Sequence, residues 1–306
     1  MNFDLVIKGG AAVVRGEIAT VDIGIVGEKI AAFGRDLPGG MEVIDASGLL
    51  VVPGGIEGHC HIDEPPLGKV RCADNFETGS RAAAFGGNTT FIPFVNQARG
   101  ESVSRSIAQY HARAGGNSYI DYGFHVIVSD PTPAILQHEL PAAAREGCPS
   151  FKVFMCYDDV KLDDSQILAV MSVARESGAL VMLHAENDHA INWLSERLRT
   201  SGRVAPKFFA EAHHSVVERE AVHRAISFAE LTGARILIVH VSSDEALKQI
   251  LWGRSRGLTV HAETCPQYLI FTERDLDRPG WDAGKVLCAP PPRTIEDRAA
   301  LWSATE

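Results

Sequence analysis

Residues 150–184 read SFKVFMCYDDVKLDDSQILAVMSVARESGALVMLH. Two short apolar runs, Ser150–Met155 and Leu180–His184, lie on either side of Asp164–Ser177, in which apolar residues recur with the period of a helix. Strands that are apolar along their whole length and alternate with helices are typical of a parallel sheet covered on both faces. We therefore expect a strand, a helix and a second, parallel strand.

The same alternation continues on both sides of this stretch. Apolar runs predict seven strands in all, at Leu49–Ile56, Thr89–Val95, Tyr119–Val128, Ser150–Met155, Leu180–His184, Arg235–Val241 and Leu258–Ala262. Helices are predicted at Phe76–Phe85, Val103–Ala114, Pro133–Arg145, Asp164–Ser177, Val216–Thr232 and Asp244–Arg256. Such units most simply form an α/β fold of the (β/α)₈ barrel type that lacks one strand, and the alternative is an open doubly wound sheet. Polar residues at the C-terminal ends of many strands favour the barrel, because barrels place their functional residues at that face.

Residues 1–50 have a different pattern. Short β-type runs are separated by glycines, at Asp4–Ile7, Val21–Val26, Lys29–Phe33 and Glu42–Asp45. A small all-β unit of this kind buries little apolar surface by itself and needs a partner. We expect two domains, this N-terminal unit over residues 1–50 and the barrel over residues 51–306.

The composition of the 306-residue chain excludes several classes of protein. Its net charge is −10 and it contains no basic run, which does not suit a nucleic-acid binder, whose Lys and Arg side chains must meet phosphate. No apolar stretch approaches the ~18 residues of a membrane span, and the N-terminus lacks the pattern of a secretory signal. The six cysteines form no C-x-x-C pair, which indicates reduced thiols. We expect a cytoplasmic protein without a nucleic-acid or membrane partner.

Histidines follow three of the predicted strands. His59 and His61, in GGIEGHCHIDEP, are two residues apart and project to the same side of an extended chain. His184 and His240 end the runs ALVMLH and RILIVH. A single histidine at such a position is compatible with a satisfied core residue, but a barrel brings all these strand ends to one mouth. Neutral imidazole is a good ligand for Zn²⁺, so we interpret the four as candidate metal ligands.

Lys152 lies inside an apolar strand, between Phe151 and Val153. Burying its ammonium group would be costly unless the stem packed while the head reached water, or a carboxylate paired with it. The other interpretation is a neutral amine that has reacted with CO₂, because burial lowers the pKa of a lysine. The resulting carbamate has two oxygens and could bridge two metals. Of the other histidines, His261 could support the site from behind its ligands, His125 is undecided, and the rest are interpreted as structural or solvated.

Six segments resemble the hydantoinase/dihydropyrimidinase family of amidohydrolases in order and spacing. They are GHCHIDEP, DNFETGSRAAAFGGNTT, SFKVFMCY, HAEND, IVHVSSDEAL and AETCPQYL, and the resemblance covers nearly the whole chain. It implies a barrel with a β-sandwich domain, of which residues 1–50 would form the N-terminal part, in a homo-oligomer, usually a tetramer. It also implies a hydrolase that opens the amide bond of cyclic ureides, namely hydantoins and dihydropyrimidines, to give N-carbamoyl amino acids by means of a hydroxide activated by two metals.

The resemblance assigns roles to individual residues. His59 and His61 would hold the more buried metal, His184 and His240 the more exposed one, and Lys152, as N6-carboxylysine, would bridge them. The metals would be two divalent ions, with Zn²⁺ favoured over Mn²⁺ or Co²⁺ by the type of ligand. Tyr157 would donate a hydrogen bond to the oxyanion of the tetrahedral intermediate.

Three segments would surround the substrate. The loops Ile62–Cys72 and Asp158–Leu162 match the family's gating loops. Cys288 and Ala289, in VLCAPPPR, lie in the segment that holds the imide edge of the substrate through backbone groups. Many hydantoinases have serine at the position of Ala289, whereas alanine is familiar in allantoinases. Allantoinase is therefore an alternative, although Tyr157 and its FMCY context favour hydantoinase.

The family also has a final barrel strand with a metal-binding aspartate, beyond the helix that here reads TIEDRAALWSATE. We expect the 306 residues to lack this strand, its aspartate and an asparagine that faces the substrate. The remaining alternative is therefore a truncated or non-catalytic assembly module that keeps the fold without turnover.

Overall fold

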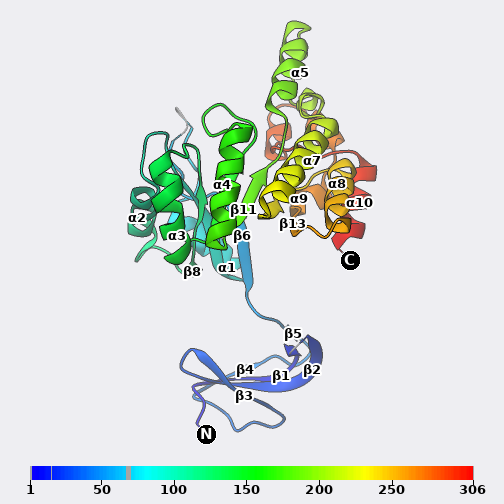
Figure 1. Ribbon diagram of the computed structural model, residues 1–306. Coiled ribbons are helices and arrows are strands. Elements are labelled where there is room, and N and C mark those ends of the chain that lie inside the picture. The colour runs from blue at the N-terminus through cyan, green and yellow to red at the C-terminus, as the bar shows by residue number, and fades with distance from the viewer. Residues whose placement is uncertain (1, 15, 67–69, 306) are drawn as a thin grey trace. The chain divides into compact units, whose positions relative to one another are not determined.

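The structure is a computed structural model that describes residues 2–14, 16–66 and 70–305. The chain forms two compact units (Figure 1). The first comprises Met1–Ile56 and Phe85–Thr90, and the second comprises Glu57–Ala84 and Phe91–Glu306. Within the described ranges, no helix is both long and apolar enough to cross a membrane.

The first unit contains a five-stranded sheet. Its strands are β1 (Leu5–Val14), β2 (Glu17–Val26), β3 (Lys29–Gly34), β4 (Glu42–Asp45) and β5 (Leu50–Val51). The order is β3-β2-β1-β4, and β5 also pairs with β1. Neighbours among β1 to β3 are antiparallel, whereas β4 and β5 run parallel to β1. The buried carboxylate of Asp22 stabilises this arrangement, because it accepts hydrogen bonds of 2.9 Å from the backbone N–H groups of both Gly9 and Leu37.

The second sheet confirms the barrel-type order predicted from the sequence. Seven strands follow one another in the order β13-β12-β11-β10-β9-β7-β6, and β8 also pairs with β7. The strands are β6 (Gly55–Cys60), β7 (Asn88–Asn96), β8 (Asp121–Tyr122), β9 (His125–Ile127), β10 (Ser150–Phe154), β11 (Leu180–His184), β12 (Arg235–Ile238) and β13 (Val260–Ala262). From β7 to β13, successive neighbours along the path pair in parallel.

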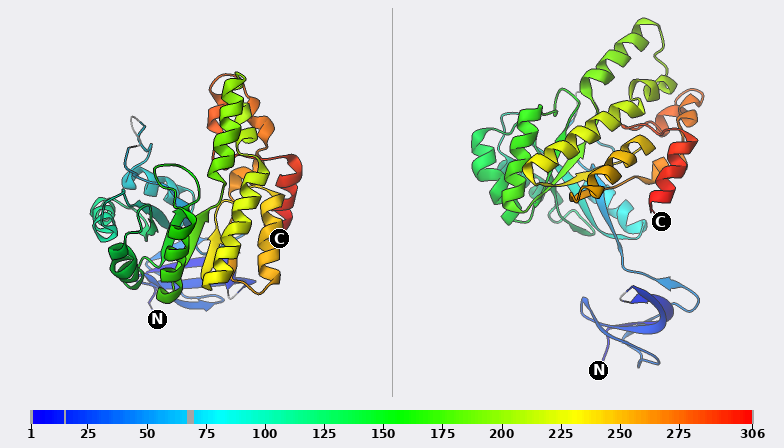
Figure 2. Two further views of the ribbon diagram at one scale, coloured as in Figure 1. Left: turned by 45° about the horizontal axis from the view of Figure 1, so that its top comes forward. Right: turned by 45° about the vertical axis from the view of Figure 1, so that its right-hand side comes forward.

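Helices connect the strands as expected. The predicted ones appear as α1 (Phe76–Phe85), α2 (Val103–Ala114), α3 (Leu140–Arg145, after a π-helical turn Ile135–Glu139), α4 (Asp164–Ser177), α7 (Ser215–Thr232) and α8 (Asp244–Ser255). Further helices are α5 (Asp188–Thr200), α6 (Phe209–Ala212), α9 (Pro266–Ile270) and α10 (Ile295–Thr305), with 3₁₀ turns at Pro206–Phe208, Glu273–Asp277 and Asp282–Lys285. The helices α7 and α8 pack side by side (Figure 2).

The two faces of the second sheet have different surroundings. Phe151, Val153 and Val181 belong to the large core formed with the helices. Ile127 and Met182 belong to a small separate cluster on the other, inner face. Lys152 is in register with both of these residues, so its side chain lies on the inner face and not among the helices.

Two predicted strands were wrong in extent. Leu49–Ile56 is not one strand, because Leu50–Val51 forms β5 in the first sheet and β6 begins only at Gly55. Pro53 lies between them, and proline lacks the N–H group that a continuous strand would need. The run Tyr119–Val128 likewise divides into β8 and β9 around Gly123. His59 therefore lies within β6 and does not follow its end.

Candidate metal centre

Three strands bring four histidines together on the inner face of the sheet. His59 lies in β6, His61 follows β6, His184 ends β11, and His240 follows β12 by two residues. The ring centroid of His59 is 5.6 Å from that of His61 and 5.5 Å from that of His240. The rings of His184 and His240 are 4.5 Å apart. The four side chains, which come from three separate motifs of the sequence, are thus neighbours.

Lys152 is completely enclosed beside these histidines. Its side chain is 1% exposed, and its Nζ lies 5.2 Å from the ring centroid of Phe94 and 5.0 Å from that of Phe154. Burial lowers the pKa of Lys152 to about 7, although the charge of Glu263 opposes the shift. A large fraction of the amine is therefore neutral near neutral pH, which is the form that reacts with CO₂.

His240 has an unused ligand atom. Its Nδ1 is buried and has no hydrogen-bond partner among the described residues. Burial lowers the pKa of His240, so that the ring is neutral, and the backbone there has a strained φ of +41°. An unpaired polar atom in a buried place is costly unless something binds it, so this observation fits a site built for a metal ion.

His184 is oriented by a buried carboxylate. Its Nε2 donates to Oε2 of Glu186 over 2.8 Å, and Nδ1 of His213 donates to Oε1 of the same carboxylate over 2.9 Å. Burial by itself raises the pKa of Glu186, but the hydrogen bonds from His184 and His213 outweigh it and place the pKa well below its usual range. Because the carboxylate can only accept, Nε2 of His184 carries the hydrogen and Nδ1 keeps its lone pair for a metal.

The other two histidines have a similar arrangement. Nδ1 of His59 donates to Glu263, and Nδ1 of His61 donates to Oε1 of Glu64 over 2.5 Å. In both rings the Nε2 atom is then the one with a free lone pair. Burial lowers the pKa of His59, which keeps that ring neutral. All four candidate histidines can therefore offer a nitrogen to a cation.

A cavity of about 380 Å³ adjoins these residues. His59, His61 and His240 form part of its wall, and Cys288 and Ala289 form another part. The structure thus brings the two residues that the sequence assigned to substrate binding next to three of the candidate ligands.

Tyr157 lies on another side of the site, against His184. The centroids of the two rings are 5.1 Å apart. Desolvation raises the pKa of Tyr157, so its phenol stays a hydrogen-bond donor. The loop Asp158–Leu162 follows it, and Arg99 donates to three carbonyl groups there, the closest being that of Lys161 at 2.9 Å. The other predicted gating loop, Ile62–Cys72, lies partly outside the described residues.

A second group of potential ligands overlaps the first. Cys156, His184 and Glu186 are all buried, and one ligand atom from each lies within 4.8 Å of the others. Burial strongly raises the pKa of the Cys156 thiol, which keeps it protonated. The Nε2 atom of His184 is already bonded to Glu186. These three residues are therefore better explained as a histidine held by its carboxylate than as a metal site.

The chain is similar to known proteins over nearly its whole length. No family model matches the chain. It is 42% identical to a D-hydantoinase of Streptomyces coelicolor over 309 residues, which cover 99% of this chain and 66% of the relative. A solved structure described as that of a D-hydantoinase superposes with a TM-score of 0.96 at 40% identity, covering 99% of this chain and 66% of the other.

This chain belongs to the hydantoinase/dihydropyrimidinase family. A crystal structure of the dihydropyrimidinase from Brevibacillus agri NCHU1002 also matches, with a TM-score of 0.94, 38% identity and coverage of 98% of this chain and 65% of the other. The chain spans about 66% of the length of the Streptomyces relative. The family is one of metal-dependent amidohydrolases, and the histidine cluster contains residues able to hold such a metal.

Three polar residues of this hydantoinase-family chain escaped the sequence analysis. Glu263, Glu186 and Arg293 each contact a candidate ligand or its support. Glu263 directly follows β13, and its position at a strand end was the available signal. The sequence analysis considered the nearby His261 as a supporting residue, but His261 is exposed. The undecided His125 is bonded to Ser150 and to the carbonyl group of Gly58, the residue before His59.

Proposed function

We propose that this chain carries the catalytic unit of a hydrolase that opens the cyclic amide bond of hydantoins and dihydropyrimidines to give N-carbamoyl amino acids. The observation that carries the proposal is the proximity of a buried lysine of lowered pKa to four histidines in or just after three strands. The adjoining cavity of about 380 Å³ has room for a small ring. The names of the matched relatives support the same reaction.

The residues that would hold the metals are those predicted from the sequence. His59 and His61 would hold one ion, His184 and His240 the other, and Lys152 would join them as N6-carboxylysine. Imidazole and carbamate ligands suit Zn²⁺. When bound, two such ions would polarise the substrate carbonyl and lower the pKa of water toward about 7, so that hydroxide is available at neutral pH.

The chain's own groups would then position the substrate and stabilise charge. Tyr157 keeps its proton, and its phenol would donate to the oxygen on which negative charge develops when the amide carbon becomes tetrahedral. Backbone groups at Cys288 and Ala289, which line the cavity, would hold the imide edge of the ring. Glu186 and Glu263 would keep His184 and His59 in the tautomers described above.

The proposed substrates are small cyclic ureides. The relatives are named for hydantoins and dihydropyrimidines, which favours these rings. Ala289, which lines the cavity, is the one residue that favours allantoin, a ureido-substituted hydantoin, because alanine at this position resembles the allantoinases. Comparing turnover of hydantoin, dihydrouracil and allantoin by the same preparation separates these choices.

We infer a homo-oligomer, with a tetramer suggested by the family resemblance, in the cytoplasm and without nucleic-acid or membrane partners. All six cysteines are free thiols, which supports a reducing compartment.

The test is an assay of the natural protein that contains these residues, prepared with zinc and bicarbonate. We expect ring opening of at least one of the three substrates, and we expect Lys152→Ala to abolish it. Lys285→Ala, which removes an exposed lysine paired with Asp282, is the matched control and should retain turnover. Metal-loaded protein that opens none of the rings, or activity that survives Lys152→Ala, would contradict the proposal and favour the non-catalytic module.

A further inference from the structure

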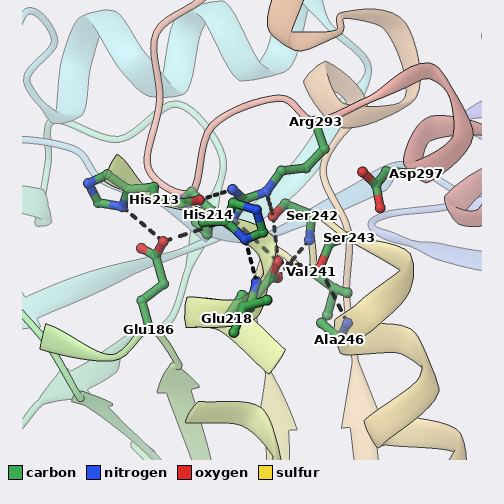
Figure 3. Close-up of polar contacts among 12 residues, drawn as sticks. Glu186, His213, His214, Glu218, Val241, Ser242, Ser243, Ala246, Arg293 and Asp297 are labelled. Carbon is green, nitrogen blue, oxygen red and sulfur yellow. Dashed lines mark hydrogen bonds and ion pairs between the residues drawn. The ribbon is translucent and has the colours of Figure 1, made fainter. Parts of the chain in front are cut away.

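Arg293 is buried and lies close to two buried carboxylates, those of Glu186 and Glu218 (Figure 3). Its Nη2 is 3.5 Å from Oε2 of Glu218 and 4.0 Å from Oε1 of Glu186. Its Nε donates to Oγ of Ser242 over 2.9 Å, and its Nη1 donates to the carbonyl group of His213. All three guanidinium nitrogens therefore have partners, and these come from four different parts of the chain.

Glu218 fixes the backbone that follows His240. Its carboxylate accepts from the N–H of Ser242 at 2.9 Å, from Oγ of Ser242 at 2.7 Å and from Oγ of Ser243 at 2.7 Å. Ser243 in turn caps α8 by accepting from the N–H of Ala246. A residue such as His240, with φ at +41°, keeps a strained backbone only where the surroundings hold it. The contacts of Glu218 hold the chain two and three residues further on.

Glu186 has the corresponding role at the end of β11. It lies two residues after His184 and bonds that ring and His213. Each of the two histidines proposed to share a metal thus has a buried carboxylate that fixes it or the backbone next to it. Two buried carboxylates near one another are unfavourable without a cation between them, and a planar guanidinium can face both at once, which an ammonium cannot.

Arg293 also connects these groups to the cavity wall. Cys288 and Ala289 line the cavity, and only Pro290, Pro291 and Pro292 separate them from Arg293. Proline fixes its own φ, so this short connection is stiff. The tyrosyl oxygen of Tyr268 further holds it by donating to the carbonyl group of Pro290 over 2.7 Å.

We propose that Arg293 is a positioning residue of the metal centre, which fixes His184 and His240 relative to each other through Glu186, Glu218 and Ser242 and ties both to the wall at Ala289. This inference rests on the proposed function, because it assumes that the two histidines are ligands. It makes Arg293 necessary for metal affinity without any contact between Arg293 and the metal.

The first experiment measures Zn²⁺ content and Zn²⁺ affinity, by competition with a chelator, on folded Arg293→Lys. Lysine keeps the positive charge and loses the planar fork, so we expect affinity to fall by about 10-fold or more, as for other residues that support metal ligands. The matched control is Arg199→Lys, which alters an exposed arginine paired with Glu196 and should bind as the wild type does. Equal affinity in Arg293→Lys and wild type would overturn the inference.

A second variant guards against a failure to fold. Ser242→Ala removes only the hydroxyl group that joins Arg293 to Glu218 and leaves every charge paired. We expect a smaller fall in Zn²⁺ affinity, with the circular dichroism spectrum unchanged, and the effects of Ser242→Ala and Arg293→Lys should not add, since both act through one network. Fully additive effects, or none from Ser242→Ala, would contradict the proposed coupling.

Two further outcomes separate this inference from the proposed function. Wild-type protein that binds no Zn²⁺ would contradict both the proposed function and the role of Arg293. Wild-type protein that binds two ions, together with Arg293→Lys that binds them equally well, would remove only the role of Arg293. Cys156→Ala should keep the full metal content, and a loss there would place the metal between Cys156, His184 and Glu186 and overturn the positioning role of Glu186.

Discussion

Glu263, directly after β13, accepts a hydrogen bond from Nδ1 of His59 in β6, the strand at the opposite end of the sheet order. The two residues are 204 positions apart in the sequence. Their contact shows that the second sheet curls until its two ends approach each other. It also means that a carboxylate from one end of the sheet sets the tautomer of a candidate ligand at the other end.

Glu263→Ala should therefore weaken the site held by His59 and His61. Without the carboxylate, His59 is free to rotate and to exchange tautomers, so we expect Zn²⁺ affinity at one of two sites to fall by about 10- to 100-fold. Elemental analysis after dialysis against a weak chelator should then give nearer one ion than two. Glu176→Ala, at an exposed position of α4, is the control. Two tightly held ions in Glu263→Ala would show that His59 does not depend on Glu263.

Lys152 should carry a carbamate in the metal-bound protein. Its lowered pKa makes the neutral amine available, and two metals would stabilise the anionic product. Intact mass under native conditions should exceed the sequence mass by one CO₂, and the excess should disappear in acid and be absent from Lys152→Ala. A metal-replete protein whose lysine is unmodified would refute this.

Local signals made parts of this fold predictable. The bounds of α2 and α4 agree with the sequence prediction because side chains next to them mark their first turns, Ser102 for α2 and Asp163 with its capping box for α4. α5 was not predicted, because it is mostly polar and buries only Ile191, so it offered no apolar run to mark it.

The positions of the candidate ligands were predictable from local sequence, but the contacts that support them were not. Each candidate ligand lies in or just after an apolar strand, so its place in the fold follows from local sequence. Arg293 reaches Glu218 across 75 residues, and its neighbours in sequence are prolines that give no sign of a buried cation. Such a contact depends on how the strands and helices pack, which no short segment encodes.

His125 should make stability depend on pH. Burial lowers its pKa to about 4, and the ring accepts from Ser150 and donates to the carbonyl group of Gly58 in the neutral form. In the unfolded chain the pKa is about 6.5, so below that pH only the unfolded state takes up the proton. The stabilisation is complete above about pH 6.5 and is lost as the pH falls toward 4.

The measurement is the free energy of unfolding in urea at pH 7 and pH 5. His125 should contribute a loss of about 2 kcal/mol between these values. Other buried groups also contribute to the pH dependence. The informative quantity is therefore the loss of unfolding free energy between pH 7 and pH 5 in wild type compared with the same loss in His125→Gln, whose side chain cannot take up a proton. Equal losses in the two proteins would mean that protonation of His125 does not cause the loss of stability.

Tyr157→Phe should separate catalysis from metal binding. The variant removes the phenolic oxygen and keeps the ring that packs against His184. Loss of one oxyanion donor typically lowers kcat by about 10²- to 10³-fold, and we expect KM and the number of bound metals to change little. Tyr119→Phe, at a tyrosine that is 62% exposed, is the matched control and should behave as wild type. A fall in metal content together with kcat would assign Tyr157 to the structure of the centre, and unchanged kcat would remove it from the mechanism.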